Sequence, residues 1–186
     1  MQTFENYLRA LVADLILEGI YFYQGFMYFY LLASQGKMIG SSGVIKLINL
    51  DEITHIILYR NILKDILDLA DSDLQSWIKT TTLDMVEEAT QEEIAWSIER
   101  YGDGKILGFS NTSITNYTRY IANKHILKPL NITSDFSKSK NPYKHLERVA
   151  NVEGKGETRD GFFEESNSDY LNLNALSGVN DFLKGY

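Results

Sequence analysis

The segment of residues 11–33, LVADLILEGIYFYQGFMYFYLLA, is almost entirely apolar and aromatic, yet it contains Asp14 and Glu18 one helical turn apart. An ionised carboxylate in an apolar interior is very costly unless it is paired or bound to a metal ion. The segment therefore predicts a buried helix in which at least one of these acids has a specific partner.

The same segment is long enough to span a membrane, because about 20 apolar residues suffice for a transmembrane helix. Asp14, Glu18 and Gln24 argue against a membrane span, since each is costly at the centre of a bilayer. No basic segment precedes the apolar run, which argues against a signal peptide. We interpret the segment as a core helix and expect no membrane partner.

Composition narrows the class of protein further. A chain of 186 residues with 44% apolar residues can build one domain with a sizeable core. The net charge of −7 argues against nucleic-acid binding, which would need a clustered basic surface. The chain has no cysteine, so disulfides, thiolate metal sites and thiol nucleophiles are excluded, and a cytoplasmic location is expected.

Long helices dominate the predicted secondary structure. Apolar spacing and capping residues predict helices over residues 4–33, 43–69, 72–100 and 110–128, the last ending before Pro129. A glycine-rich turn precedes the second helix, with Ser41 and Ser42 as expected N-caps. Helices of this length joined by short turns pack as a bundle, so the predicted fold class is all-α, over residues 1–131.

The remaining residues, 132–186, differ in composition from the helical region. They are rich in Ser, Asn, Gly, Lys and acidic residues, which is typical of an extended arm followed by a flexible tail. The chain nevertheless ends with bulky apolar residues, including Phe182 and Leu183. This end is either a frayed terminus or a peptide that becomes ordered in the groove of a partner.

Glu52 and His55 form the motif with the clearest chemistry. They are three residues apart, so both project from one face of the second helix. Such a pair alone can be a chance surface pair, but Glu18 lies on the preceding helix, which packs antiparallel against this one. One Glu from one helix and Glu-x-x-His from the next make half of the di-metal carboxylate site of ferritin-like bundles. We predict that Glu18, Glu52 and His55 bind iron or manganese; Asp14 either supports a ligand or faces a polar groove.

Four motifs of the chain are informative together: LILEGIYFYQGF, SQGKMIGSSGVIKLINLDEITH, EEIAWSIERYGDGKILGFSN and KNPYKHLERVANVEGKGETRDGFFE. They resemble the small, radical-generating subunit of class I ribonucleotide reductase. The resemblance covers essentially the whole chain. It implies a ferritin-like bundle that generates the radical with which a large subunit reduces ribonucleotides to deoxyribonucleotides.

The resemblance also implies roles for further residues near the metal ligands. Asp51 matches the acid that links the metal site to the long-range electron and proton relay, although Leu50 replaces a basic residue common in the family. Phe22 and Phe26 match apolar side chains that wall off the radical from water; alternatively, both are ordinary core residues.

In the tail, the resemblance implies contacts with the large subunit. Tyr170 matches the tyrosine that passes the radical across the subunit interface, although it is one of twelve tyrosines in the chain. The final residues match the peptide that docks in the large subunit, with Asp181, Phe182, Leu183 and Tyr186 as its expected contacts.

The sequence supplies only part of the expected metal site. A two-metal site of this class needs about six protein ligands, whereas we find three, and the N-terminal half of the family's small subunit has no counterpart here. We favour a split subunit, in which a separate polypeptide supplies the other ligands and shares two iron or manganese ions. A degenerate remnant and two identical chains that pool their ligands remain alternatives, as does another ferritin-like oxidase. We expect the assembled small subunit to dimerise and to bind the large subunit.

Overall fold

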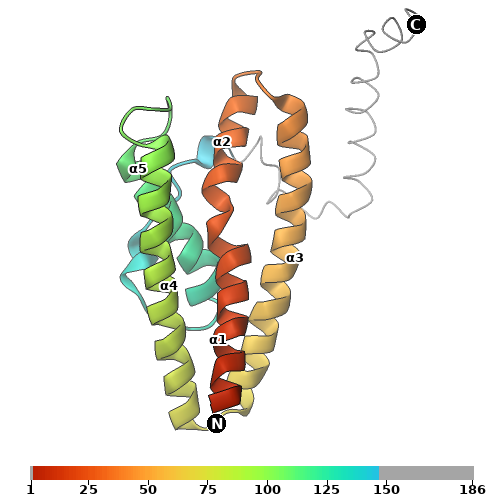
Figure 1. Cartoon of the computed structure of the whole chain (residues 1–186), viewed down its shortest axis with the longest axis vertical. Helices are drawn as coiled ribbons and strands as arrows, with labels where there is room; N and C mark the ends of the chain where they lie inside the picture. Colours follow the sequence, from red (N-terminus) through yellow and green to blue (C-terminus); the bar gives the residue numbers. More distant parts are fainter. Residues whose placement is uncertain (1, 147–186) are drawn as a thin grey trace, which may run out of the picture. The chain divides into compact units, whose positions relative to one another are not determined.

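Long helices joined by short turns make up the computed structural model, which describes residues 2–146 (Figure 1). The helix α1 (Gln2–Ile16), the π-helical turn η1 (Leu17–Tyr21) and the helix α2 (Tyr23–Ser34) follow one another as a nearly continuous rod. The helix α3 (Ile39–Leu69) returns alongside this rod, and α4 (Ser72–Tyr101) runs in the opposite direction to α3 (Figure 1). The predicted all-α bundle is confirmed.

Shorter elements complete the bundle. The helix α5 (Asn111–Ala122) packs against α4 and α2 and continues into a second π-helical turn, η2 (Asn123–Leu127), which contacts η1. Two 3₁₀ turns follow, η3 (Asp135–Lys138) and η4 (Lys144–Leu146), and they pack against α5 and α2 respectively. The described chain after α5 therefore returns to the helices at η2, η3 and η4.

One hydrophobic core joins all of these helices. Its most deeply buried side chains come from different elements, with Leu15, Tyr30, Leu63, Val86 and Ile114 each 0% exposed. Burial of such side chains removes apolar surface from water, which is the main force that holds a helical bundle together. The core explains why the apolar run of residues 11–33 is compatible with a globular fold.

The rod of α1, η1 and α2 is also apolar enough to resemble a membrane span. Residues Thr3–Ser34 meet the length and hydropathy criteria for such a span, but 56% of the most apolar window is buried inside the bundle. Core helices of globular proteins commonly meet the same criteria, so this burial accounts for the apolar sequence.

The start of α3 differs from the prediction. The helix begins at Ile39, so the predicted N-caps Ser41 and Ser42 are wrong, and Ser42 is buried within α3. The chain reverses direction earlier, at Gly36 and Met38, which have φ values of 73° and 49°. These two positive-φ residues complete the turn before the chain reaches the serines. The predicted cap of α4 is confirmed, because the Asp71 side chain accepts a hydrogen bond from the Leu74 amide at 2.9 Å.

Residues 132–146 belong to the stretch that we assign to an arm on composition. Phe136, Tyr143 and Leu146 are nevertheless 9%, 2% and 1% exposed. The Tyr143 hydroxyl lies 3.2 Å from the Ser113 hydroxyl of α5, so a polar contact accompanies the packing. The first part of the predicted arm thus contributes side chains to the core.

Candidate metal centre

Three potential metal ligands converge where η1 faces α3. Glu18 belongs to η1, whereas Glu52 and His55 lie one turn apart on α3. Each side chain offers one donor atom, and the three atoms lie within 4.8 Å of one another. The sequence predicted this group, and the packing of the rod against α3 brings its members together.

His55 lies between the two carboxylates. Its Nδ1 is 3.1 Å from Oε2 of Glu52 and 3.6 Å from Oε2 of Glu18. The side chains of Glu52 and Glu18 are 12% and 18% exposed, whereas that of His55 is 48% exposed. The donor group is therefore held by the bundle on one side and open on the other.

Burial and the neighbouring carboxyl group of Glu18 change the protonation of Glu52. Partial burial and a hydrogen bond with Glu18 together raise the pKa of Glu52 to about 7, against the opposing effect of the neighbouring His55. The hydrogen bond to Glu52 raises the pKa of His55. Two close carboxylates cannot both stay ionised without a compensating positive charge, so a proton on Glu52 relieves their repulsion near neutral pH.

A divalent cation would supply the same compensating charge. Two carboxylate oxygens and one imidazole nitrogen are a donor set that suits iron and manganese, and the span of 4.8 Å lets one ion contact all three donors. Since metal ligands must be deprotonated, binding would release the protons that the cluster holds. The residues present therefore fit one half of a two-metal carboxylate site.

Exposed apolar side chains occur on both elements that carry this cluster. On α3, Val44, Ile48 and Leu58 are 56%, 38% and 54% exposed. They share one helical face with Asp51 and His55, because these residues recur at intervals of three, four or seven. On the rod, the exposed apolar residues are Phe4, Tyr7, Leu17 and Phe22. A row of exposed apolar residues along one helical face, as on α3, is typical of a protein interface.

The two phenylalanines predicted to wall the site lie in different environments. Phe26 is 4% exposed, whereas Phe22 is 39% exposed, and their rings stack with centroids 6.1 Å apart. They follow Glu18 by four and eight residues, so they continue along the same side of the rod. Their role in excluding water from a metal site stays a prediction.

The remaining predicted residues are less constrained. Asp14 and Asp51 are both exposed, Asp14 on α1 and Asp51 directly before Glu52 on α3. The tail residues Tyr170, Asp181, Phe182, Leu183 and Tyr186 lie outside the described residues. The predicted relay and docking roles therefore stay predictions.

Sequence reasoning missed one residue next to the centre. His125, in η2, is 8% exposed, and its Nδ1 lies 3.0 Å from the backbone carbonyl oxygen of Gly19, the residue after Glu18. The contact joins residues 106 positions apart, and His125 has no partner glutamate at helical spacing. Nothing in the local sequence could have indicated it.

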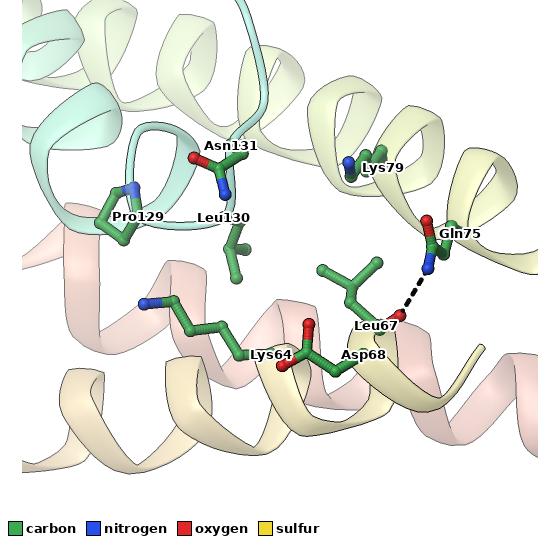
Figure 2. A pocket seen from close by; sticks show the side chains of 8 residues that line it. All are labelled: Lys64, Leu67, Asp68, Gln75, Lys79, Pro129, Leu130 and Asn131. Carbon is green, nitrogen blue, oxygen red and sulfur yellow. Dashed lines mark hydrogen bonds between the residues drawn. The ribbon is translucent and has the colours of Figure 1, made fainter. Parts of the chain in front are cut away.

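A pocket of about 280 Å³ lies elsewhere in the bundle, between the end of α3, the start of α4 and the turn after η2 (Figure 2). Lys64 and Asp68 line it from α3, Lys79 from α4 and Asn131 from the turn. The Gln75 side chain closes one end by donating a hydrogen bond to the Leu67 carbonyl at 2.9 Å. None of the three potential metal ligands lines this pocket.

Comparison with known proteins gives one consistent match. Residues 1–142 match the family model "Ribonucleotide reductase, small chain". The chain is 33% identical to the ribonucleoside-diphosphate reductase subunit beta of Halalkalibacterium halodurans over 96% of its length, and 37% identical to that of Treponema pallidum over 62%. The ribonucleotide reductase R2 subunit from Clostridium botulinum has a similar structure, with a TM-score of 0.69 and 33% identity over 79% of this chain.

The relatives are longer than this chain. The alignments cover 51% of the Halalkalibacterium halodurans protein, 33% of the Treponema pallidum protein and 46% of the Clostridium botulinum structure. The chain thus spans about half the length of the first of these relatives.

Proposed function

Because the chain belongs to the ribonucleotide reductase small-chain family, we propose that it supplies half of a two-metal carboxylate site to a radical-generating small subunit. The observation that carries this proposal is the convergence of Glu18, Glu52 and His55 within 4.8 Å. These three residues would be ligands to iron, to manganese or to one ion of each.

The chain's own residues prepare the site in two ways. Glu52, which shares a hydrogen bond with Glu18, holds a proton near neutral pH and would release it when a cation takes the place of that proton. The buried ring of Phe26, two turns after Glu18, keeps water from that side of the rod. Bound at such a site, a pair of iron or manganese ions supplies the one-electron oxidant for ribonucleotide reduction.

We propose that a separate polypeptide completes the centre. It would bring the other carboxylate and Glu-x-x-His ligands, because a two-metal site needs about six protein ligands. Two features support this arrangement: the 48% exposure of the His55 side chain, and the exposed apolar residues on the same face of α3. The partner would cover the apolar surface and complete the coordination together, so association and metal loading would strengthen each other.

The proposed assembly also includes the large reductase subunit. Asp51, exposed on α3 beside Glu52, and Tyr170 in the tail would carry the electron and proton relay between the metal centre and that subunit. The last residues, with Phe182 and Leu183, would dock in its surface. In this scheme the chain acts in the cytoplasm, within a dimer of the assembled small subunit.

The experiment is expression of the full chain alone and together with a polypeptide that carries the complementary carboxylate and Glu-x-x-His motif. Native mass spectrometry gives the mass of each species, and elemental analysis gives its iron and manganese content. We expect a stable complex with two metal ions per small-subunit unit. Glu52→Gln should lose at least one metal equivalent, whereas Glu88→Gln, which changes an exposed glutamate of α4, should lose none.

Three outcomes would change the account. A lone chain that is a monomer with a full pair of metal ions would contradict the need for a partner. A two-fold dimer of the lone chain with two metal ions would instead mean that identical chains pool their ligands. Unchanged metal content in Glu52→Gln would contradict the ligand assignment itself.

A further inference from the structure

His125 connects the two π-helical turns of the bundle. Its Nδ1 lies 3.0 Å from the Gly19 carbonyl oxygen in η1. Its ring also packs edge-on against Tyr23, with centroids 4.6 Å apart and an interplanar angle of 61°. His125 therefore contacts the rod on both sides of the point at which η1 ends and α2 begins.

The backbone of η1 lies directly against η2. A Cβ atom added to Gly19 would meet the side chain of Ile126 at 3.6 Å and the Cβ of His125 at 3.7 Å, which is ordinary van der Waals contact. No side chain of residue 19 separates the two turns, so the position of η2 sets the position of the η1 backbone. Glu18 projects from the residue before this contact.

A π-helical turn needs such external support more than a regular helix does. Its backbone hydrogen bonds join residues five apart. Such turns are rare in proteins overall, but those that occur are frequently found at functional sites. Buried carbonyl groups at irregular turns are usually satisfied by side chains or water. A carbonyl oxygen can only accept a hydrogen bond, so Nδ1 of His125 must be the donor.

The protonation state of His125 is compatible with this contact. Burial lowers its pKa to about 4, so the imidazole is neutral at neutral pH and carries its proton on Nδ1. A neutral ring can be buried at low cost when its hydrogen bond is satisfied. The contact is therefore made by the neutral ring that burial favours at neutral pH.

We propose that His125 is a positioning residue for Glu18. Its hydrogen bond to the Gly19 carbonyl and its packing against Tyr23 hold η1 in the π-helical geometry that directs Glu18 toward Glu52 and His55. This inference rests on the proposed metal-binding function. Residues that orient metal ligands without touching the metal typically change metal affinity about 10- to 100-fold when they are replaced.

A histidine that only fills the core would contribute packing but no needed hydrogen bond to Gly19. Two substitutions of His125 separate the hydrogen bond from the packing. His125→Phe keeps a buried ring against Tyr23 but removes the donor to Gly19. His125→Asn loses the ring but restores an amide donor near the position of Nδ1. Leu130→Ala is the control, since Leu130 is 3% exposed and follows η2 but makes no hydrogen bond to η1.

The first measurement is the affinity of the full-length chain for Mn²⁺, from the loss of the electron paramagnetic resonance signal of the free ion. We expect His125→Phe to bind Mn²⁺ about tenfold more weakly, within the range for such orienting residues, and His125→Asn to recover most of this loss. Leu130→Ala should lower the thermal midpoint without changing Mn²⁺ affinity. Equal affinities in the unmodified chain and His125→Phe would overturn the proposal.

The second measurement needs no metal. Hydrogen exchange of the metal-free chain should show faster exchange of the η1 amides in His125→Phe than in the unmodified chain, with α4 unchanged and His125→Asn again intermediate. Exchange that rises equally in η1 and α4 would mean a purely structural role and overturn the proposal. If the unmodified chain alone binds no Mn²⁺, the same affinities are compared in its complex with the complementary polypeptide, while the exchange data still decide whether His125 holds η1.

Discussion

Nδ1 of His55 lies 3.6 Å from Oε2 of Glu18, although the two residues belong to helical segments on opposite sides of the reversal at residues 35–38. The contact depends on the register between the rod and α3. The Asn49 side chain, which donates a hydrogen bond to the Tyr30 hydroxyl at 3.1 Å, joins α3 to α2 in the same register. Since both groups are buried, this hydrogen bond helps to fix the alignment that brings the ligands together.

Tyr30→Phe tests the importance of this hydrogen bond. The substitution leaves the buried Asn49 amide without its acceptor, which typically costs about 1–3 kcal/mol. We expect the free energy of unfolding, measured by urea denaturation, to fall by this amount with an unchanged m-value.

Tyr23→Phe is the matched control for that substitution. Tyr23 is 5% exposed, and its hydroxyl has no hydrogen-bond partner among residues 2–146. Removing an unsatisfied buried hydroxyl should leave the free energy of unfolding unchanged or raise it. A larger loss in Tyr23→Phe than in Tyr30→Phe would contradict the register argument.

Glu93 makes the stability of the bundle depend on pH. Burial raises the pKa of this glutamate in α4 to about 7, and the hydrogen bond from Ser97 at 2.9 Å only partly offsets the effect of burial. The folded protein therefore binds a proton more tightly than the unfolded chain does. The stabilisation that the proton on Glu93 gives the folded protein is fully present below the ordinary pKa of 4.5. It is lost as the pH rises through about 7.

Glu93→Gln should remove this dependence. At pH 8 we expect the variant to be more stable than the unmodified protein, by up to about 3 kcal/mol, with the difference shrinking below pH 5. Thermal unfolding at pH 5, 6, 7 and 8 measures this difference, with Glu88→Gln on the exposed side of α4 as control. A variant that is less stable than the unmodified protein at pH 8 would contradict this account, because it would show that ionised Glu93 stabilises the folded protein.

The tail should be separable from the bundle. Removing residues 175–186, which lie outside the described residues, should leave unfolding and metal binding unchanged but abolish turnover with the large subunit, because only the proposed docking peptide is lost. Tyr170→Phe should keep the affinity for the large subunit and lose turnover, since phenylalanine has no phenolic hydrogen to give up. Turnover by the shortened chain would show that docking lies elsewhere.

Helical periodicity and a local motif were sufficient to predict much of this protein. The spacing of Glu52 and His55 fixed their common face, and the cost of burying Glu18 among apolar residues indicated a specific partner. The π-helical form of η1 and its contact with His125 could not be predicted in the same way. Both depend on tertiary packing between residues 106 positions apart, which leaves no local pattern.

The start of α3 shows a second limit of the sequence. Serines 41 and 42 are good N-caps by residue type, but capping requires that the chain enter the helix at that point. The reversal is instead completed at Gly36 and Met38, where the backbone adopts positive φ. Glycine predicts that conformation, whereas methionine at φ 49° does not, so the earlier start could not be read from composition.

The most direct test of the account is to locate Mn²⁺ on the full-length chain by paramagnetic broadening of its amide NMR signals. Because the broadening falls steeply with distance from the ion, substoichiometric Mn²⁺ should first remove the signals around Glu18 in η1 and around Glu52 and His55 in α3. The same titration of Glu52→Gln should leave those signals in place. Broadening centred on the exposed acidic residues of α4, or no difference between the two proteins, would contradict the assignment of Glu18, Glu52 and His55 as metal ligands.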